Sequence, residues 1–187
     1  SLTSVTLGEN ATIGKQAFYS CSSLTDIDLS KAVSIGDYAF SGDEYYICND
    51  ENMQIAAVSL EGEYMTTNHS TSLVKADLSA ATSVGEYAFA MCESLTEVVL
   101  GEGITEIPTY AFASCPSLQT INLDKVQTIG EYAFQETEKL ESVNVSDVVV
   151  TPVIGEDAFE IAVLPSTLPE GMEITLFWED LHCHSQP

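Results

Sequence analysis

A six-residue pattern, Leu-x-x-apolar-x-Leu, recurs along the chain, and a second pattern, apolar-Gly-x-x-Ala-Phe, follows each clear copy, with Pro108 in place of the glycine once. In the second half of the first pattern, apolar and polar residues alternate, which predicts a short strand with one buried face. Clear copies begin at Leu2, Leu24, Leu73, Leu95, Leu118 and Leu140, and a degenerate copy begins at Ile55. The hydrophobic pattern therefore predicts seven short strands.

The Ala-Phe pair sets the period of the chain. Its gaps are 22, 49, 23, 22 and 25 residues, and the longest gap is about two periods. A fixed period of this size is typical of a solenoid, in which stacked repeats bury a face that none of them could bury alone. We expect the strands to pair side by side and the Phe residues to form an internal row opposite them, with members Phe18, Phe40, Phe89, Phe112, Phe134 and Phe159. The glycine that precedes five of the six Ala-Phe pairs predicts a tight bend where backbone approaches backbone, and Pro108 replaces it once.

A cysteine follows several of the Phe residues at a distance of three positions, at Cys21, Cys92 and Cys115, and Asp43 and Thr137 take its place in two copies. Together these motifs resemble the BspA-like, or Treponema-type, leucine-rich repeat over about residues 1–159, less the irregular stretch 41–72. The resemblance implies a leucine-rich repeat solenoid: a right-handed α/β-type superhelix, β-rich, with parallel strands on the concave face and short turns or strands opposite. It also implies an extracellular or bacterial cell-surface protein with a role in adhesion.

The pattern divides the chain into a solenoid of six or seven repeats, residues 1–159, and a C-terminal cap and tail, residues 160–187. Ile174 to Trp178 reads as a final strand that covers the open end of the core. The first repeat begins at Ser1-Leu2 with no capping element, although a solenoid needs capped ends. We therefore expect the chain to be a trimmed piece of a longer protein.

Residues 41–72 break the rhythm, because 32 residues separate Phe40 from Leu73 where a regular repeat has five. One interpretation is a degenerate repeat around 55–60, in which the aromatic residues of the stretch fill the gap left by a missing Phe. The other is an insertion with protruding loops that bind a partner. Its contact residues would then be Tyr45, Tyr46, Tyr64 and Met65, which are large or adaptable side chains.

The charge excludes several partners. The chain has 29 acidic residues against five lysines and no arginine, for a net charge of −24. Such a chain repels nucleic acid and anionic membrane surfaces. The charge serves either to keep the solenoid soluble and monomeric or to attract cationic partners and divalent ions. Four acids lie at outward positions of the predicted strands: Asp26, Asp28, Asp77 and Glu97. They offer at most weak Ca²⁺ sites, because no single loop brings them together.

No catalytic or cofactor-binding motif stands out. The three histidines, His69, His182 and His184, lie off the regular repeats, and no phosphate-binding loop or dinucleotide fingerprint is present. His182-Cys183-His184 lacks the second ligand pair of a structural zinc site, so we read it as a tail. The five cysteines are an odd number, and the three in the repeats predict a buried, reduced row rather than a disulfide framework. We expect a protein without enzymatic activity, cofactor or metal.

The remaining function is binding. The outward positions of the predicted strands are polar and carry no aromatic ring, which disfavours a sugar platform. A second row, Tyr38, Tyr87, Tyr110 and Tyr132, either packs between repeats or forms a contact strip. No run of 18 apolar residues exists to insert in a membrane. We expect protein–protein interaction, with host matrix or another cell surface as the partner; an architectural spacer and a glycan-binding module are the alternatives.

Overall fold

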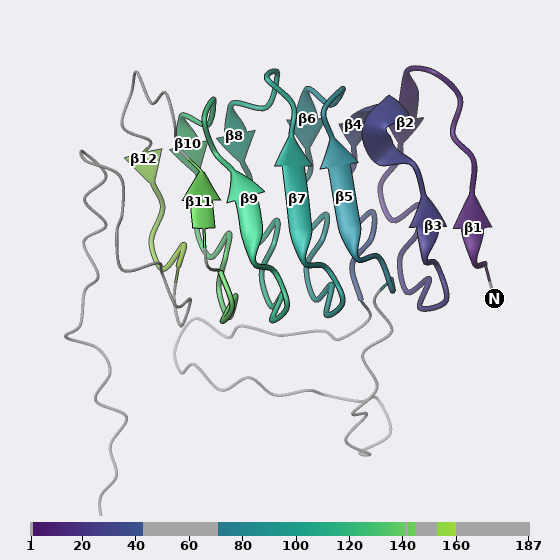
Figure 1. The fold of residues 1–187 in the computed structure, drawn as a ribbon. Coiled ribbons are helices and arrows are strands. Elements are labelled where there is room, and N and C mark those ends of the chain that lie inside the picture. Colours follow the sequence, from purple (N-terminus) through teal and green to yellow (C-terminus); the bar gives the residue numbers. More distant parts are fainter. Residues whose placement is uncertain (1, 43–70, 141, 145–152, 160–187) are drawn as a thin grey trace, which may run out of the picture.

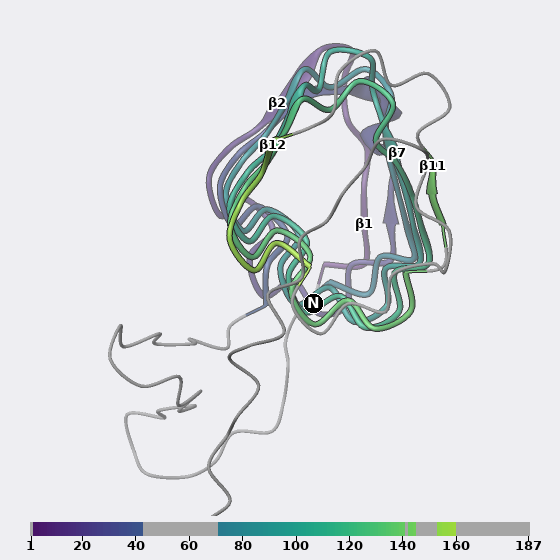
Figure 2. The ribbon, with the colours of Figure 1, turned by 90° about the vertical axis from the view of Figure 1, so that its left-hand side faces the viewer.

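The computed structural model describes residues 2–42, 71–140, 142–144 and 153–159. Within them the chain winds through six successive repeats, and each repeat contributes two short strands (Figure 1). We number the repeats 1 (2–21), 2 (24–42), 3 (73–92), 4 (95–115), 5 (118–137) and 6 (140–159, described in part). Viewed along the stack, the repeats superimpose into one closed outline, with β7 and β11 on one side and β2 and β12 opposite (Figure 2).

The predicted Leu-x-x-apolar-x-Leu strands form the first sheet. They pair in parallel in the order β11-β9-β7-β5, in a register that places Lys75 beside Glu97 and Glu97 beside Thr120. A separate parallel pair joins β1 to β3. In β3, β5, β7 and β9 the inward apolar residues are buried as the alternation predicted, and Val5 of β1 is partly buried. The bounds of these strands are β1 Ser4–Val5, β3 Asp26–Ile27, β5 Lys75–Leu78, β7 Glu97–Leu100, β9 Thr120–Asn122 and β11 Ser142–Asn144.

The opposite side of each repeat also carries a strand. These second strands pair in parallel in the orders β2-β4-β6 and β8-β10-β12. They immediately precede the Gly or Pro that begins the next turn, and they end on a buried apolar residue such as Ile35 or Ile107. Their bounds are β2 Ala11–Ile13, β4 Ala32–Ile35, β6 Ser83–Val84, β8 Glu106–Ile107, β10 Thr128–Ile129 and β12 Val153–Ile154.

The third side, from the glycine to beyond the Phe, consists of overlapping turns. Within a repeat, the N–H of Ala88 donates to the carbonyl of Gly85 (3.3 Å) and the N–H of Ala90 to that of Tyr87 (3.1 Å). The intervening N–H of Phe89 instead donates to Ala111 in the next repeat (2.9 Å). This alternation requires left-handed backbone at two positions per repeat, for example φ 55° at Tyr87 and 61° at Met91.

Helix content is low, in agreement with the expected β-rich superhelix that has short turns or strands opposite the first sheet. The only helix in the described ranges is a 3-10 turn, η1, at Leu29–Lys31. The left-handed residues explain this, because they interrupt the right-handed backbone that an α-helix on the third side would need. The fold is therefore a parallel β-solenoid with strands on two sides and turns on the third.

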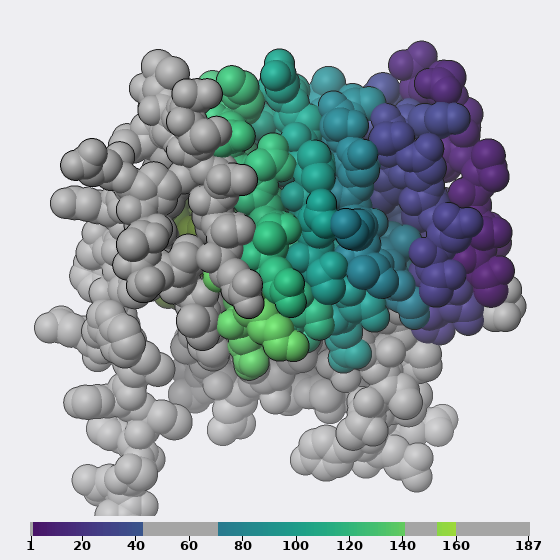
Figure 3. Space-filling view, in the orientation of Figure 1, coloured from purple at the N-terminus to yellow at the C-terminus, as the bar shows by residue number. Residues whose placement is uncertain are grey.

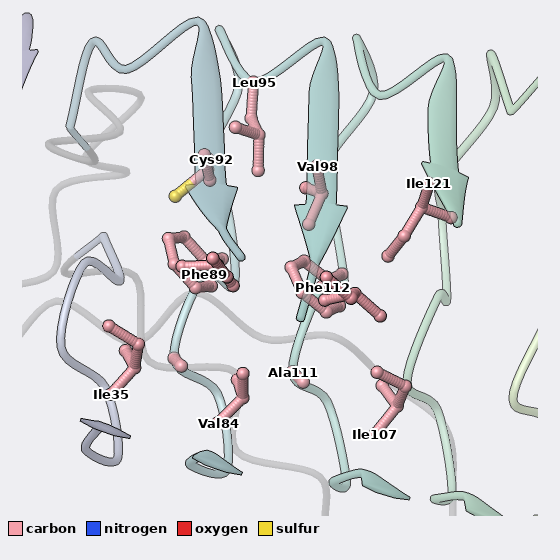
Figure 4. Close-up of a cluster of buried hydrophobic side chains, with 14 of the residues drawn as sticks. Ile35, Val84, Phe89, Cys92, Leu95, Val98, Ile107, Ala111, Phe112 and Ile121 are labelled. Atoms are coloured by element: carbon pink, nitrogen blue, oxygen red, sulfur yellow. The ribbon is translucent and has the colours of Figure 1, made fainter. Parts of the chain in front are cut away.

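The Phe row is internal, as predicted. Phe40, Phe89, Phe112 and Phe134 have no exposed surface, and the ring centroids of successive members lie 5.1–5.7 Å apart. Figure 4 shows Phe89 and Phe112 between inward side chains of the first sheet, such as Val98, and those of the second strands, such as Ile107. One continuous core thus runs through the stack.

Repeats 2 and 3 are in direct contact, although 32 residues separate Phe40 from Leu73. The rings of Phe40 and Phe89 stack with centroids 5.1 Å apart, and β4 pairs with β6 through Ile35 and Val84. These contacts leave no place in the stack for a further repeat between repeats 2 and 3. Residues 43–70, including the predicted degenerate repeat at 55–60 and the alternative of protruding loops, lie outside the described residues, and both interpretations stay predictions.

The first sheet is interrupted at the same point. Repeats 2 and 3 are joined there by Ser72, whose N–H donates to the carbonyl of Leu24 (3.0 Å) and whose hydroxyl donates to that of Ser22 (2.7 Å). The stack nevertheless continues across the junction, as the successive colour bands in Figure 3 show. The expected cap and tail, 160–187, with the strand at 174–178, lies outside the described residues and stays a prediction.

Candidate binding surfaces

Two of the acids expected on the outward side of the first sheet close local turns. The carboxylate of Asp28 caps η1, where it accepts hydrogen bonds from the hydroxyl of Ser30 and from its backbone N–H (3.1 Å). Both bonds lower the pKa of Asp28, and the bond from the Ser30 hydroxyl has the larger effect. Asp77 makes the equivalent bond to the N–H of Ser79 (3.0 Å). Both acids therefore shape the chain at the ends of their strands.

The other two acids lie in different surroundings. Glu97 forms an ion pair with Lys75 across β5 and β7, and Asp26 is exposed on β3. Among the described residues, no three His, Cys, Asp or Glu side chains are grouped so that they could hold a metal ion. The fold does not bring the four predicted acids together into one site.

Sequence reasoning gave Asn122 no role beyond an outward polar position. Its amide Oδ1 accepts from the N–H of Leu100 (2.6 Å), and its Nδ2 donates to the carbonyl of the same residue (3.1 Å). Backbone pairing between β7 and β9 covers only Glu97–Thr120 and Val98–Ile121. The side chain thus continues the pairing where the strands stop, and the recurrence of Asn at 144, the same position of the next repeat, was the available signal.

A pocket of about 250 Å³ lies beside this contact, at the turns that follow β7 and β9. Backbone and side chains of both turns line it, including Glu102, Asp124 and Lys125. Its wall is also formed by Asn122, whose amide is already committed to Leu100. We assign no chemistry to it.

The second tyrosine row is a ladder of stacked rings. The centroids of Tyr38, Tyr87, Tyr110 and Tyr132 lie 4.7–4.8 Å apart with interplanar angles of 5–13°. All four side chains are half-buried, and all have left-handed φ of 54–56°. The rings therefore pack between repeats, and their remaining surface faces outward. The two expectations for this row are compatible.

The position before the tyrosine, or before Gln16 and Asp157 where these replace the tyrosine, carries a charge in most repeats. Read along the stack, this position holds Lys15, Asp37, Glu86, Thr109, Glu131 and Glu156. The Nζ of Lys15 lies 3.6 Å from the Oδ2 of Asp37 and 5.6 Å from the centre of the Tyr38 ring. We call the tyrosine ladder with its neighbouring acids the tyrosine strip, and its members are Tyr38, Tyr87, Tyr110, Tyr132, Asp37, Glu86, Glu131 and Glu156.

The cysteine row is buried and reduced where it is fully enclosed, as predicted. Cys92 and Cys115 have no exposed surface and form no disulfide, and Cys21 is half-buried. The thiols of Cys92 and Cys115 donate to the carbonyls of Phe40 (3.5 Å) and Phe89 (3.1 Å) in the preceding repeats. Burial raises the pKa of Cys92 to about 12 and that of Cys115 well above its usual value. These thiols thus stay protonated at neutral pH.

Thr137 occupies the cysteine position in repeat 5 and makes the same bond, from its hydroxyl to the carbonyl of Phe112 (3.2 Å). We therefore predict that Cys115→Thr changes the free energy of unfolding by less than about 0.5 kcal/mol, whereas Cys115→Val, which has the shape but no donor, costs about 1 kcal/mol. Urea denaturation of both variants measures the difference. Equal stabilities would mean that the row contributes packing alone.

The expected contact residues Tyr45, Tyr46, Tyr64 and Met65 lie outside the described residues, as do His69 and the predicted tail with His182, Cys183 and His184. Their roles stay predictions. In the ranges that the structure describes, no helix is long and apolar enough to span a membrane.

These features define a parallel β-solenoid built from leucine-rich repeats, with Cys or Thr bonded across the repeats. The model of the BspA-type leucine-rich repeat region matches six copies over residues 1–56 and 63–167. The chain belongs to the BspA-type leucine-rich repeat family.

No match is found among curated proteins. Among solved structures, the chain is similar to the crystal structure of a leucine-rich repeat protein from Bacteroides ovatus, with 21% sequence identity and a TM-score of 0.57. The likeness covers 87% of this chain and 42% of that one, so the chain spans less than half of its length. At this identity the comparison shows the fold alone.

Proposed function

We propose that this chain is a non-catalytic protein-binding domain of a bacterial cell-surface or secreted protein, and that it contributes to adhesion to host proteins. Membership of the leucine-rich repeat family supports protein interaction. The described part of the chain supports a scaffold role, because its polar side chains close turns, cap η1 or bond between repeats. The identity of the partner and the location at the cell surface are proposals that go beyond family membership.

The insertion is the observation that carries the proposal. Phe40 and Phe89 stack directly, so repeats 2 and 3 are adjacent in the stack although residues 43–70 lie between them in the sequence. Insertions in repeat proteins map to loops, often on the binding face. This one contains three tyrosines and two methionines, which suit contact with varied protein surfaces. We infer that a protein ligand contacts the insertion.

We predict that replacing Tyr45, Tyr46 and Tyr64 together with Ser weakens binding to a host extracellular-matrix protein at least about tenfold, or about 1.4 kcal/mol. The reason is the loss of three large aromatic contact surfaces. Surface plasmon resonance against a panel of matrix proteins, with the unaltered chain beside the triple variant, measures the change.

A shortened chain separates binding from folding. Replacing residues 43–70 with a single Ser leaves five residues between Phe40 and Leu73, the spacing of a regular repeat. We expect this variant to unfold at nearly the same temperature as the unaltered chain and to lose the binding. A shortened chain that stays folded and binds at full strength would remove the insertion from the binding site. If the unaltered chain binds none of the proteins, an architectural spacer becomes the better description.

A further inference from the structure

The N-terminal end of the stack exposes apolar residues whose equivalents are buried elsewhere in it. Leu2 is 46% exposed, whereas Leu24 and Leu118, which occupy the same position in later repeats, have no exposed surface. The ring of Phe18 is partly buried and, among the described residues, stacks on Phe40 alone, at 5.2 Å. This end, purple in Figure 3, therefore presents part of the apolar core at the surface.

The backbone at this end is also without partners on one side. Within the described residues, β1 and β2 are the outermost strands of their sheets, and each pairs with a single neighbour (Figure 1). On the turn side, the N–H groups of one repeat donate to carbonyls of the next, from Phe18 to Ala39 (2.8 Å) and from Phe40 to Ala88 (2.8 Å). The equivalent carbonyl of repeat 1 is that of Ala17, to which no described N–H donates. Unpaired backbone groups along an edge are a template for further pairing.

Gly14 indicates what kind of neighbour fits this edge. In later repeats the same glycine lies against the backbone of the preceding repeat. A Cβ at Gly36 would lie 2.6 Å from the backbone nitrogen of Lys15, and one at Gly130 would lie 2.8 Å from the backbone carbon of Pro108. A Cβ at Gly14 would meet no described atom within 4 Å, and Gly14 lacks the positive φ that would itself favour glycine. Repeat 1 thus has clearance for the backbone of a repeat that precedes it.

We infer that the N-terminal end of the stack is an interface for a further leucine-rich repeat of the same polypeptide, placed before repeat 1. The end continues the established interfaces between repeats, because it presents the same ring, strand edges and glycine. The added repeat stacks its Phe on Phe18, donates to the carbonyl of Ala17 and brings its backbone against Gly14. A repeat of the same polypeptide avoids the entropy cost of association that a separate chain would pay.

The test adds a repeat to the whole chain. A copy of residues 118–139, which is one period of the pattern, replaces Ser1 directly before Leu2. In the control chain the copy carries Phe134→Ser, which removes the ring that stacks on Phe18. Cys21 is half-buried and reports whether the end is covered. Its labelling by a maleimide, mapped by mass spectrometry, is expected to slow at least about tenfold with the added repeat and less than about twofold with the control copy.

Gly14→Ala tests the approach of the backbone. We expect this substitution to lower the midpoint of thermal unfolding by at least about 4 °C in the extended chain and by less than about 2 °C in the unaltered one. The reason is that the Cβ meets backbone only when a repeat lies beside it. Equal shifts in the two chains, or unchanged labelling of Cys21 in the extended chain, would overturn the inference.

Two further results concern the source of the repeat. The sequence encoded directly before Ser1 is expected to carry the repeat pattern, with an Ala-Phe pair about one period before Phe18. Its absence there would overturn the inference. So would a dimer of the unaltered chain, seen by analytical ultracentrifugation, that the added repeat abolishes, because this end would then bind a second copy of the chain. None of these results affects the proposed function, which is tested with matrix proteins and the insertion variants.

Discussion

Phe112→Ala is expected to lower the free energy of unfolding by about 3–5 kcal/mol, the range for emptying a buried Phe site. Phe112 has no exposed surface, and its ring stacks on Phe89 (5.5 Å) and on Phe134 (5.7 Å). Complete repeats enclose the site on both sides, so the backbone has little freedom to collapse into the cavity. Urea denaturation followed by circular dichroism measures the change.

Phe18→Ala is the matched control. Phe18 is only partly buried and, among the described residues, its ring stacks on Phe40 alone, at 5.2 Å. Its truncation should cost less than about 2 kcal/mol, since less apolar area is lost and solvent is already near. A cost below about 1 kcal/mol for Phe112→Ala would contradict the internal Phe row.

Gly130→Ala is expected to cost about 1–3 kcal/mol. A Cβ at Gly130 would lie 2.5 Å from the backbone nitrogen of Thr109 and 2.8 Å from the backbone carbon of Pro108 in the preceding repeat. Backbone atoms cannot rotate away as a side chain can, so the two repeats would have to separate. The effect should appear in the same denaturation experiment.

Gly14→Ala tests the explanation, because Gly14 occupies the same position in repeat 1 and a Cβ there would meet no described atom within 4 Å. We expect its stability to change by less than about 1 kcal/mol, with the smaller unfolded-state entropy of Ala acting in its favour. If both substitutions destabilise equally, the glycine is needed for the backbone conformation of its own turn rather than for the approach of its neighbour.

The repeat pattern predicted most of the scaffold because each element of it is local. Alternation identified the first strands, the Phe period identified the internal row, and the recurring glycine identified the close approach that Gly36 and Gly130 make to the preceding repeat. The buried cysteine row followed from its fixed position after Phe. Hydrophobic pattern and period depend only on the order of residues, and they determined the solenoid and its family before any contact was known.

The binding surfaces were harder to predict from the sequence. The strip joins Asp37, Glu86, Glu131 and Glu156 to the tyrosine ladder, and these acids lie far apart in sequence until the repeats stack in register. Asp28 and Asp77 looked like free outward acids, but each bonds to a serine two residues later. Whether an acid is committed or available depends on its hydrogen-bond partners, which a periodic pattern does not report.

By itself the sequence determined the repeat, its inward and outward residues and its family. Only the tertiary structure decided that repeats 2 and 3 are direct neighbours in the stack. A hexamer can match the strand pattern, as the one at Ile55 does, but the pattern alone does not show which repeats are neighbours in the stack. Phe40 packs on Phe89, which lies 49 residues later in the sequence. Contact between two rings depends on their distance in space and not on the length of chain between them.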